Sequence, residues 1–234
     1  MQRERGLIVG VADSNDKFAR GSVASVYLLF KGDARPDRHA IRSFAEVNRS
    51  TTLTLDPAQR AALHVVNEDD TEASVVAAQA EANSNQRDWV ELLRSGLTFD
   101  IEGLAPGEGF DVPETENFFD CASDYNAEGA SAIRLVTGAH LAGSANSLPV
   151  LRGMLGLARD LVEHFEQVST VIWPPSASAI GRRYFESTTT AWLDGGAFPA
   201  LGLTAFKETI DGGLESVGLD FLIGQELRIE PALA

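Results

Sequence analysis

Four histidines are the first residues to consider as acid or base catalysts: His39, His64, His140 and His164. His140 stands out because it follows an apolar run and Gly138 and precedes a predicted helix start. Open sheets place ligand-contacting side chains at such an edge. If the fold brings Tyr184 or Glu226 beside His140, an acid/base pair results. The alternative is a strand-end histidine whose ring bonds a backbone carbonyl, and we expect this second arrangement.

Trp173 and Arg182 are two further candidates for contact with a ligand. Trp173 ends the apolar stretch STVIW, and the two prolines after it cannot donate to a sheet ladder. We therefore expect its ring to pack at the border of the core rather than stack on a ligand. Arg182 adjoins Arg183 on the next predicted helix. This pair could hold a carboxylate of a ligand or partner, although surface solubility explains it equally well.

Motifs for known chemistry are missing from the sequence. It contains no nucleophile elbow, no P-loop, no dinucleotide-binding glycine motif and no metalloprotease helix motif. No Cys/His pair has zinc-ligand spacing, and the loop at 124–129 has Leu135 where a calcium loop needs its closing Glu. Cys121 is the single cysteine, and its acidic neighbours should raise the pKa of its thiol. We predict no metal and no cofactor, and leave open whether the protein is an enzyme.

The charge of the chain restricts its partners. Its formal net charge of −15 repels nucleic-acid phosphates and anionic lipid, so we expect it to bind neither nucleic acid nor membrane. No Lys or Arg lies between Arg94 and Arg134, although nine carboxylates do. This stretch is either a solvated connection or a surface for a basic protein. No apolar run approaches the roughly 18 residues of a membrane span, and no signal peptide is evident, so we expect a cytoplasmic protein.

Hydrophobic periodicity predicts strands and helices in alternation. Strands are expected at 22–30, 51–55, 62–66, 97–101 and 169–173 and in the apolar run that begins at 131; helices are expected after Pro36, at 71–82, from 89 to Gly96, after an N-cap at Ser147 and over 180–192. Asp211-Gly212 indicates a hairpin turn near the C-terminus. The pattern predicts an α+β fold, a mainly antiparallel sheet with helices packed on one face.

Two ferredoxin-like halves would be one way to build this fold. The expected organisation is an N-terminal extension (1–20), a first α+β half (21–101), an acidic connection (102–130) and a second α+β half (131–234). The alternative is one compact unit. The sequence shows no residue-level repeat between the halves, so duplication stays a hypothesis.

Four short motifs in the second half carry a resemblance to a family. They are TGAHLAG, VIWPPSA, GGAFPALGL and GLDFLIGQELRIEP, and they fall within residues 131–231. In this order they resemble a group of bacterial domains of unknown function. The resemblance implies a bacterial, cytoplasmic α+β protein and supplies no mechanism. It draws attention to His140, Trp173 and Glu226.

Three classes of function remain after these exclusions. We favour a non-enzymatic binding or protein-interaction module whose acidic surface meets a basic protein partner. The alternative is a small-molecule enzyme or ligand-binding protein with a cleft between the halves, built on His140, Tyr184 and Glu226. The third is a structural subunit whose terminal hairpin pairs with a second copy. The sequence leaves the oligomeric state open.

Overall fold

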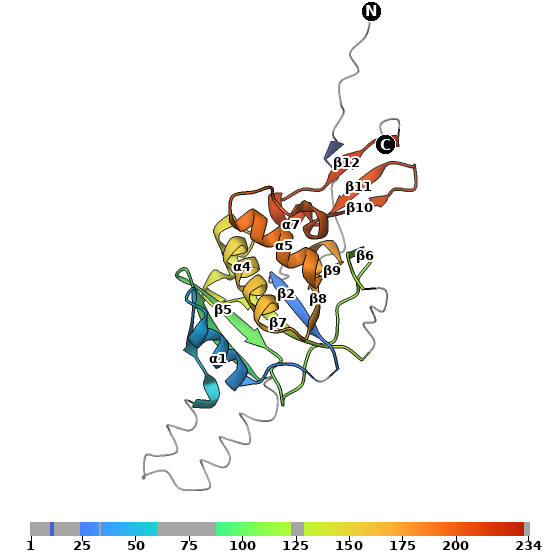
Figure 1. Cartoon of the computed structure of the whole chain (residues 1–234). Coiled ribbons are helices and arrows are strands. Elements are labelled where there is room, and N and C mark those ends of the chain that lie inside the picture. The colour runs from blue at the N-terminus through green and yellow to red at the C-terminus, as the bar shows by residue number, and fades with distance from the viewer. Residues whose placement is uncertain (1–9, 12–23, 33, 60–87, 123–128, 232–234) are drawn as a thin grey trace, which may run out of the picture.

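One large sheet forms the centre of the molecule (Figure 1). The computed structural model describes residues 10–11, 24–32, 34–59, 88–122 and 129–231. Within them eight strands follow the order β3 (Thr51–Leu55), β4 (Trp89–Arg94), β5 (Leu97–Glu102), β7 (Ser131–Thr137), β2 (Ser25–Phe30), β8 (Val168–Trp173), β9 (Ser178–Gly181) and β6 (Asn117–Phe119). Among these eight described strands, only β6 and β9 pair in parallel. The predicted α+β class with a mainly antiparallel sheet is confirmed.

Strands from both halves of the sequence alternate within this sheet. β2, from the first half, lies between β7 and β8 from the second, so that Leu28 faces Ile133 on one side and Val171 on the other. All three side chains are fully buried. The structure does not confirm two ferredoxin-like halves, because each half depends on strands of the other for its hydrogen bonds.

Among the described residues, three longer helices pack on one face of the sheet: α1 (Arg38–Val47), α4 (Leu148–His164) and α5 (Arg182–Leu193) (Figure 1). Their apolar stripes share one core with alternate residues of the strands, including Val90 and Leu92 of β4. The Asp37 side chain accepts a hydrogen bond from the Ala40 N–H and so caps α1. Ser147 is the N-cap of α4, as predicted, but its side chain makes no capping bond.

The predicted helix from residue 89 to Gly96 is wrong, because this segment is strand β4. Val90 and Leu92 are buried while their neighbours Trp89 and Glu91 are half-buried on the opposite face, which is the alternation of a strand. Ser95 and Gly96, with φ of 51° and 79°, form the tight turn into β5. The spacing of Trp89, Val90, Leu92 and Leu93 also fits a helix. Pairing with β3 and β5 decides for a strand, and the spacing of neighbouring residues does not reveal that pairing.

Residues 103–122 cross the opposite face of the sheet. Phe110 and Val112 pack there on a small apolar cluster that contains Leu29 and Ile172. The Phe110 N–H donates to the Ala132 carbonyl at 2.9 Å. The part of the predicted acidic connection before residue 123 therefore runs along the sheet and includes β6, the last strand in the order.

A second, four-stranded sheet stands at one end of the molecule (Figure 1). Its order is β1 (Gly10–Val11), β12 (Leu227–Ile229), β11 (Leu214–Val217) and β10 (Ala205–Glu208), all antiparallel. The predicted hairpin turn at Asp211-Gly212 joins β10 and β11. Two short helices, α6 (Ala200–Leu203) and α7 (Leu219–Ile223), adjoin this sheet in the chain.

Several short elements of the structure differ from those that the sequence predicts. Ile180, expected in a helix, belongs to β9, which folds back on β8 through η2 (Pro174–Ser176) and a left-handed Ala177. The run after β7 enters the 3-10 helix η1 (Ala139–Ser144). The expected strand at 62–66 and helix at 71–82 lie outside the described residues, as do His64 and residues 124–128.

Candidate functional site

Trp173 is an internal side chain at the end of β8. Its exposure is 1%, and its indole N–H donates to the Leu203 carbonyl at 3.0 Å. The Phe221 ring packs edge-on against it with centroids 5.4 Å apart. A ring whose faces and N–H are all occupied by protein has no surface on which a ligand could stack.

Arg182 and Glu226 each close the end of a helix. The Arg182 guanidinium donates to the carbonyl of Phe165, the C-cap of α4, at 2.7 Å and to the carbonyl of Glu163 in the last turn of α4 at 3.4 Å. The Glu226 carboxylate accepts from the backbone N–H groups of Gly218 and Asp220, at 2.8 and 3.1 Å, at the start of α7. These contacts satisfy backbone groups that a helix end leaves unpaired.

His140 and Tyr184 lie on different elements. His140 is exposed on η1, and its Nδ1 lies 3.4 Å from the Thr98 hydroxyl. Tyr184 is half-buried against the core on α5. In the described part of the chain, no hydrogen bond joins His140, Tyr184 or Glu226 to one another. The proposed acid/base constellation therefore has no supporting contact.

Asp100 is the titratable group with the most perturbed environment near His140. The pKa of this carboxyl is raised to about 6, mainly by burial and also by the charges of Glu91 and Glu102, while the charge of His140 acts in the opposite direction. Its Oδ1 is buried and has no hydrogen-bond partner among the described residues. Asp100 and Glu91 face each other across β4 and β5, so like charges are concentrated on this face of the sheet.

Cys121 follows β6 and is poorly suited to act as a nucleophile. Burial raises the pKa of its thiol, and the charge of Asp120 adds to this effect. The Sγ atom lies 3.3 Å from the Ala179 carbonyl. The predicted direction is correct, but burial contributes more than the acidic neighbours do.

We call residues 108–120 the acidic edge. Its exposed carboxylates are those of Glu108, Asp111, Glu114, Glu116 and Asp120. The Ala177 carbonyl accepts hydrogen bonds from the N–H groups of Glu116 and Asn117, at 2.8 and 3.1 Å, and the Asn117 amide donates to the Ser176 carbonyl. The backbone of the acidic edge is therefore held at fixed points, and its carboxylates have a set spacing.

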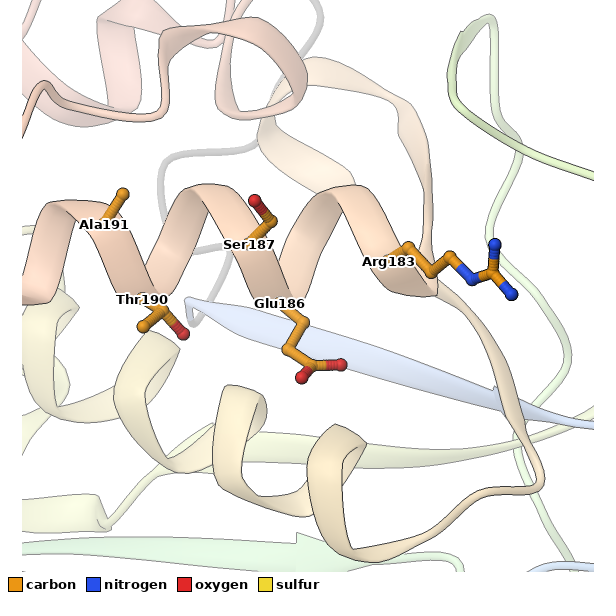
Figure 2. A pocket seen from close by; sticks show the side chains of 5 residues that line it. All are labelled: Arg183, Glu186, Ser187, Thr190 and Ala191. Carbon is orange, nitrogen blue, oxygen red and sulfur yellow. The ribbon is translucent and has the colours of Figure 1, made fainter.

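Two surface depressions of about 470 Å³ each lie along α4 and α5. One follows α5, where Glu186 and Thr190 point toward α4 and Arg183 extends away from the helix (Figure 2). The other lies between the end of β4 and the start of α4, and its lining includes Arg94 and Arg152. No motif or spacing in the sequence marks these two arginines as candidates.

The part of the chain that the structure describes contains no cluster of three or more His, Cys, Asp or Glu side chains that could hold a metal ion. None of the helices described is long and apolar enough to cross a membrane. Comparison with known protein families, with curated proteins and with solved structures found no match. The resemblance of residues 131–231 to bacterial domains of unknown function is not tested by these comparisons and stays a prediction.

Proposed function

We propose that this protein is a non-enzymatic binding module whose acidic edge docks a basic segment of a partner protein. The observation that carries the proposal is the fixed display of five exposed carboxylates on a backbone held by Ala177 and Ser176. A flexible acidic linker would have to lose conformational entropy on binding. A fixed segment has already lost it on folding, which favours affinity.

Phe118 supplies an apolar anchor within the acidic edge. Its side chain is 55% exposed, and Glu116 and Asp120, which flank β6, are also exposed. Large aromatic side chains surrounded by polar residues are typical of the few positions that dominate binding energy. A partner segment that combines Lys or Arg with an apolar side chain fits this pattern.

Long-range electrostatics support the same proposal. The formal net charge of the whole chain is −15, and five exposed carboxylates lie within the acidic edge itself. A basic segment would be steered toward this surface during diffusion, and salt would screen the attraction.

The test uses the full-length chain and a labelled peptide in which lysine alternates with leucine, with binding measured by fluorescence anisotropy. We expect affinity to fall steeply as ionic strength rises from about 0.01 M to about 0.15 M, because the Debye length shortens from about 30 Å to about 8 Å. We expect Glu114→Gln/Glu116→Gln to weaken binding about three- to ten-fold and Phe118→Ala about ten-fold.

The matched control is Glu163→Gln/Glu166→Gln, which removes the same charge from exposed positions at the end of α4. It should leave binding nearly unchanged. If the control weakens binding as much as the double variant in the acidic edge, only net charge matters and the docking surface is wrong. Binding that does not respond to salt would also contradict the proposal.

A further inference from the structure

A pocket lined by arginines lies between the end of β4, helix α4 and the end of α5. Its volume is about 470 Å³, and its lining includes Arg94 from the end of β4, Arg152 and Arg159 from α4, and the apolar side chains of Leu148, Pro149 and Leu193. Of the described residues that line it, none is Asp or Glu. Three arginines gathered in one hollow are unexpected in a chain with 34 acidic and 19 basic residues.

One carboxylate serves two of these arginines. Asp160, 8% exposed, pairs with Arg94 through one oxygen and with Arg159 Nε at 2.7 Å through the other. Arg152 has no carboxylate partner in the described structure, since its guanidinium donates to the carbonyls of Trp192 and Leu193. Three positive charges and one negative charge leave the group with a net charge of about +2.

The guanidinium groups are held in place by protein contacts. The Arg152 guanidinium carbon lies 4.8 Å from the centre of the Trp192 ring, and Arg159 donates to the Thr190 hydroxyl at 3.1 Å. Gly156 leaves room for Arg94 against α4, because a Cβ there would lie 3.3 Å from the Arg94 Nε. Such fixed side chains lose little further entropy when they bind a ligand.

Donors remain available after these contacts. Arg152 Nε and one terminal nitrogen of both Arg94 and Arg159 have no acceptor among the described residues. The first turn of the 17-residue helix α4 also lines the pocket, so the positive end of its dipole lies there.

We propose that this arginine pocket binds the phosphate group of a small phosphate monoester. Guanidinium groups form paired hydrogen bonds with phosphate and carboxylate alike. Three of them, approaching from a strand end and from two positions two turns apart on a helix, suit a tetrahedral group with three terminal oxygens and about two negative charges at neutral pH. Leu148, Pro149 and Leu193 provide apolar contacts for the organic part of the ligand.

The experiment is isothermal titration of the full-length protein with phenyl phosphate, benzoate and inorganic phosphate at constant ionic strength. We expect saturable binding of phenyl phosphate, weaker binding of inorganic phosphate and the weakest of benzoate. Arg152→Gln should weaken phenyl phosphate binding about ten-fold or more, because it removes a charged donor from the pocket.

Leu148→Glu provides a second variant that keeps every arginine. Leu148 is 59% exposed at the first position of α4, where a carboxylate favours the helix. The variant should fold at least as stably as the wild type and still bind phenyl phosphate several-fold more weakly. The control Arg183→Gln removes one exposed arginine of the other depression and should leave affinity unchanged (Figure 2).

Several outcomes would overturn the proposal. The pocket is not an anion site if no probe shows saturable binding, or if Arg183→Gln weakens binding as much as Arg152→Gln. Benzoate that binds as tightly as phenyl phosphate would reject phosphate as the ligand class. Unchanged affinity in a folded Leu148→Glu variant would place the bound anion elsewhere.

Discussion

Gly181 determines how closely β6 approaches β9, and therefore where the acidic edge lies. A Cβ built on Gly181 would lie 2.6 Å from the carbonyl carbon of Asp120 and closer still to its oxygen, and 3.2 Å from the Cys121 nitrogen. Real Cβ atoms essentially never approach other atoms to within 3.0 Å. Because the obstacle is backbone, a side-chain rotation cannot relieve it. Gly181→Ala must displace the end of β6 or distort β9.

We expect Gly181→Ala to lower the free energy of unfolding by about 1 to 3 kcal/mol, the usual cost of forcing an extra methyl group into a packed site. With a urea m-value of about 2 kcal/mol/M, the unfolding midpoint should fall by about 0.5 to 1.5 M. The local displacement has its own measurement. Cys121, the single cysteine, adjoins the clash, so its reaction with a thiol reagent should accelerate.

Gly143→Ala is the matched control. Nothing lies within 4 Å of a Cβ built at Gly143, and its φ is not in the left-handed region. This variant should change stability by less than about 0.5 kcal/mol and leave the thiol rate of Cys121 unchanged. The reasoning fails if Gly181→Ala matches the wild type in both urea midpoint and thiol rate, because β6 would then not depend on this contact.

Two further predictions concern buried charge. Asp160→Asn should lower the free energy of unfolding by about 3 kcal/mol or more, because it leaves Arg94 without its buried partner. Urea unfolding measures this change. A loss below about 1 kcal/mol would show that the ion pair is solvated. Asp100 has a folded-state pKa of about 6, above the value of 3.8 for a free carboxyl. Its ionised form therefore destabilises the folded state above about pH 6, and this destabilisation disappears as the pH falls toward 4. Asp100→Asn should therefore raise stability by about 1 kcal/mol near pH 7.5, after allowance for solvent screening, and by much less near pH 4; an equal gain at both pH values would contradict this.

Local patterns in the sequence determined most of the longer elements. The apolar stripe of α4, the strand that ends at Trp173 and the hairpin turn at Asp211-Gly212 were predictable, because each depends on residues a few positions apart. The α+β class followed from their alternation. The excess of carboxylates between Arg94 and Arg134 was also predictable, because charged residues can be counted without knowledge of the fold.

The candidate sites needed the tertiary structure. Arg152 and Arg159, two turns apart, share a face of α4 that the sequence could have indicated, but only the register of β4 brings Arg94 to them. The tertiary structure also removed two sequence candidates from the possible sites: Trp173 is a core residue whose indole bonds Leu203, thirty residues away, and Glu226 caps the start of α7. Hydrophobic periodicity and charge are properties of residues close together in the chain, so they can be read from the sequence. Strand register joins residues far apart in the chain, and the packing of the whole core determines it.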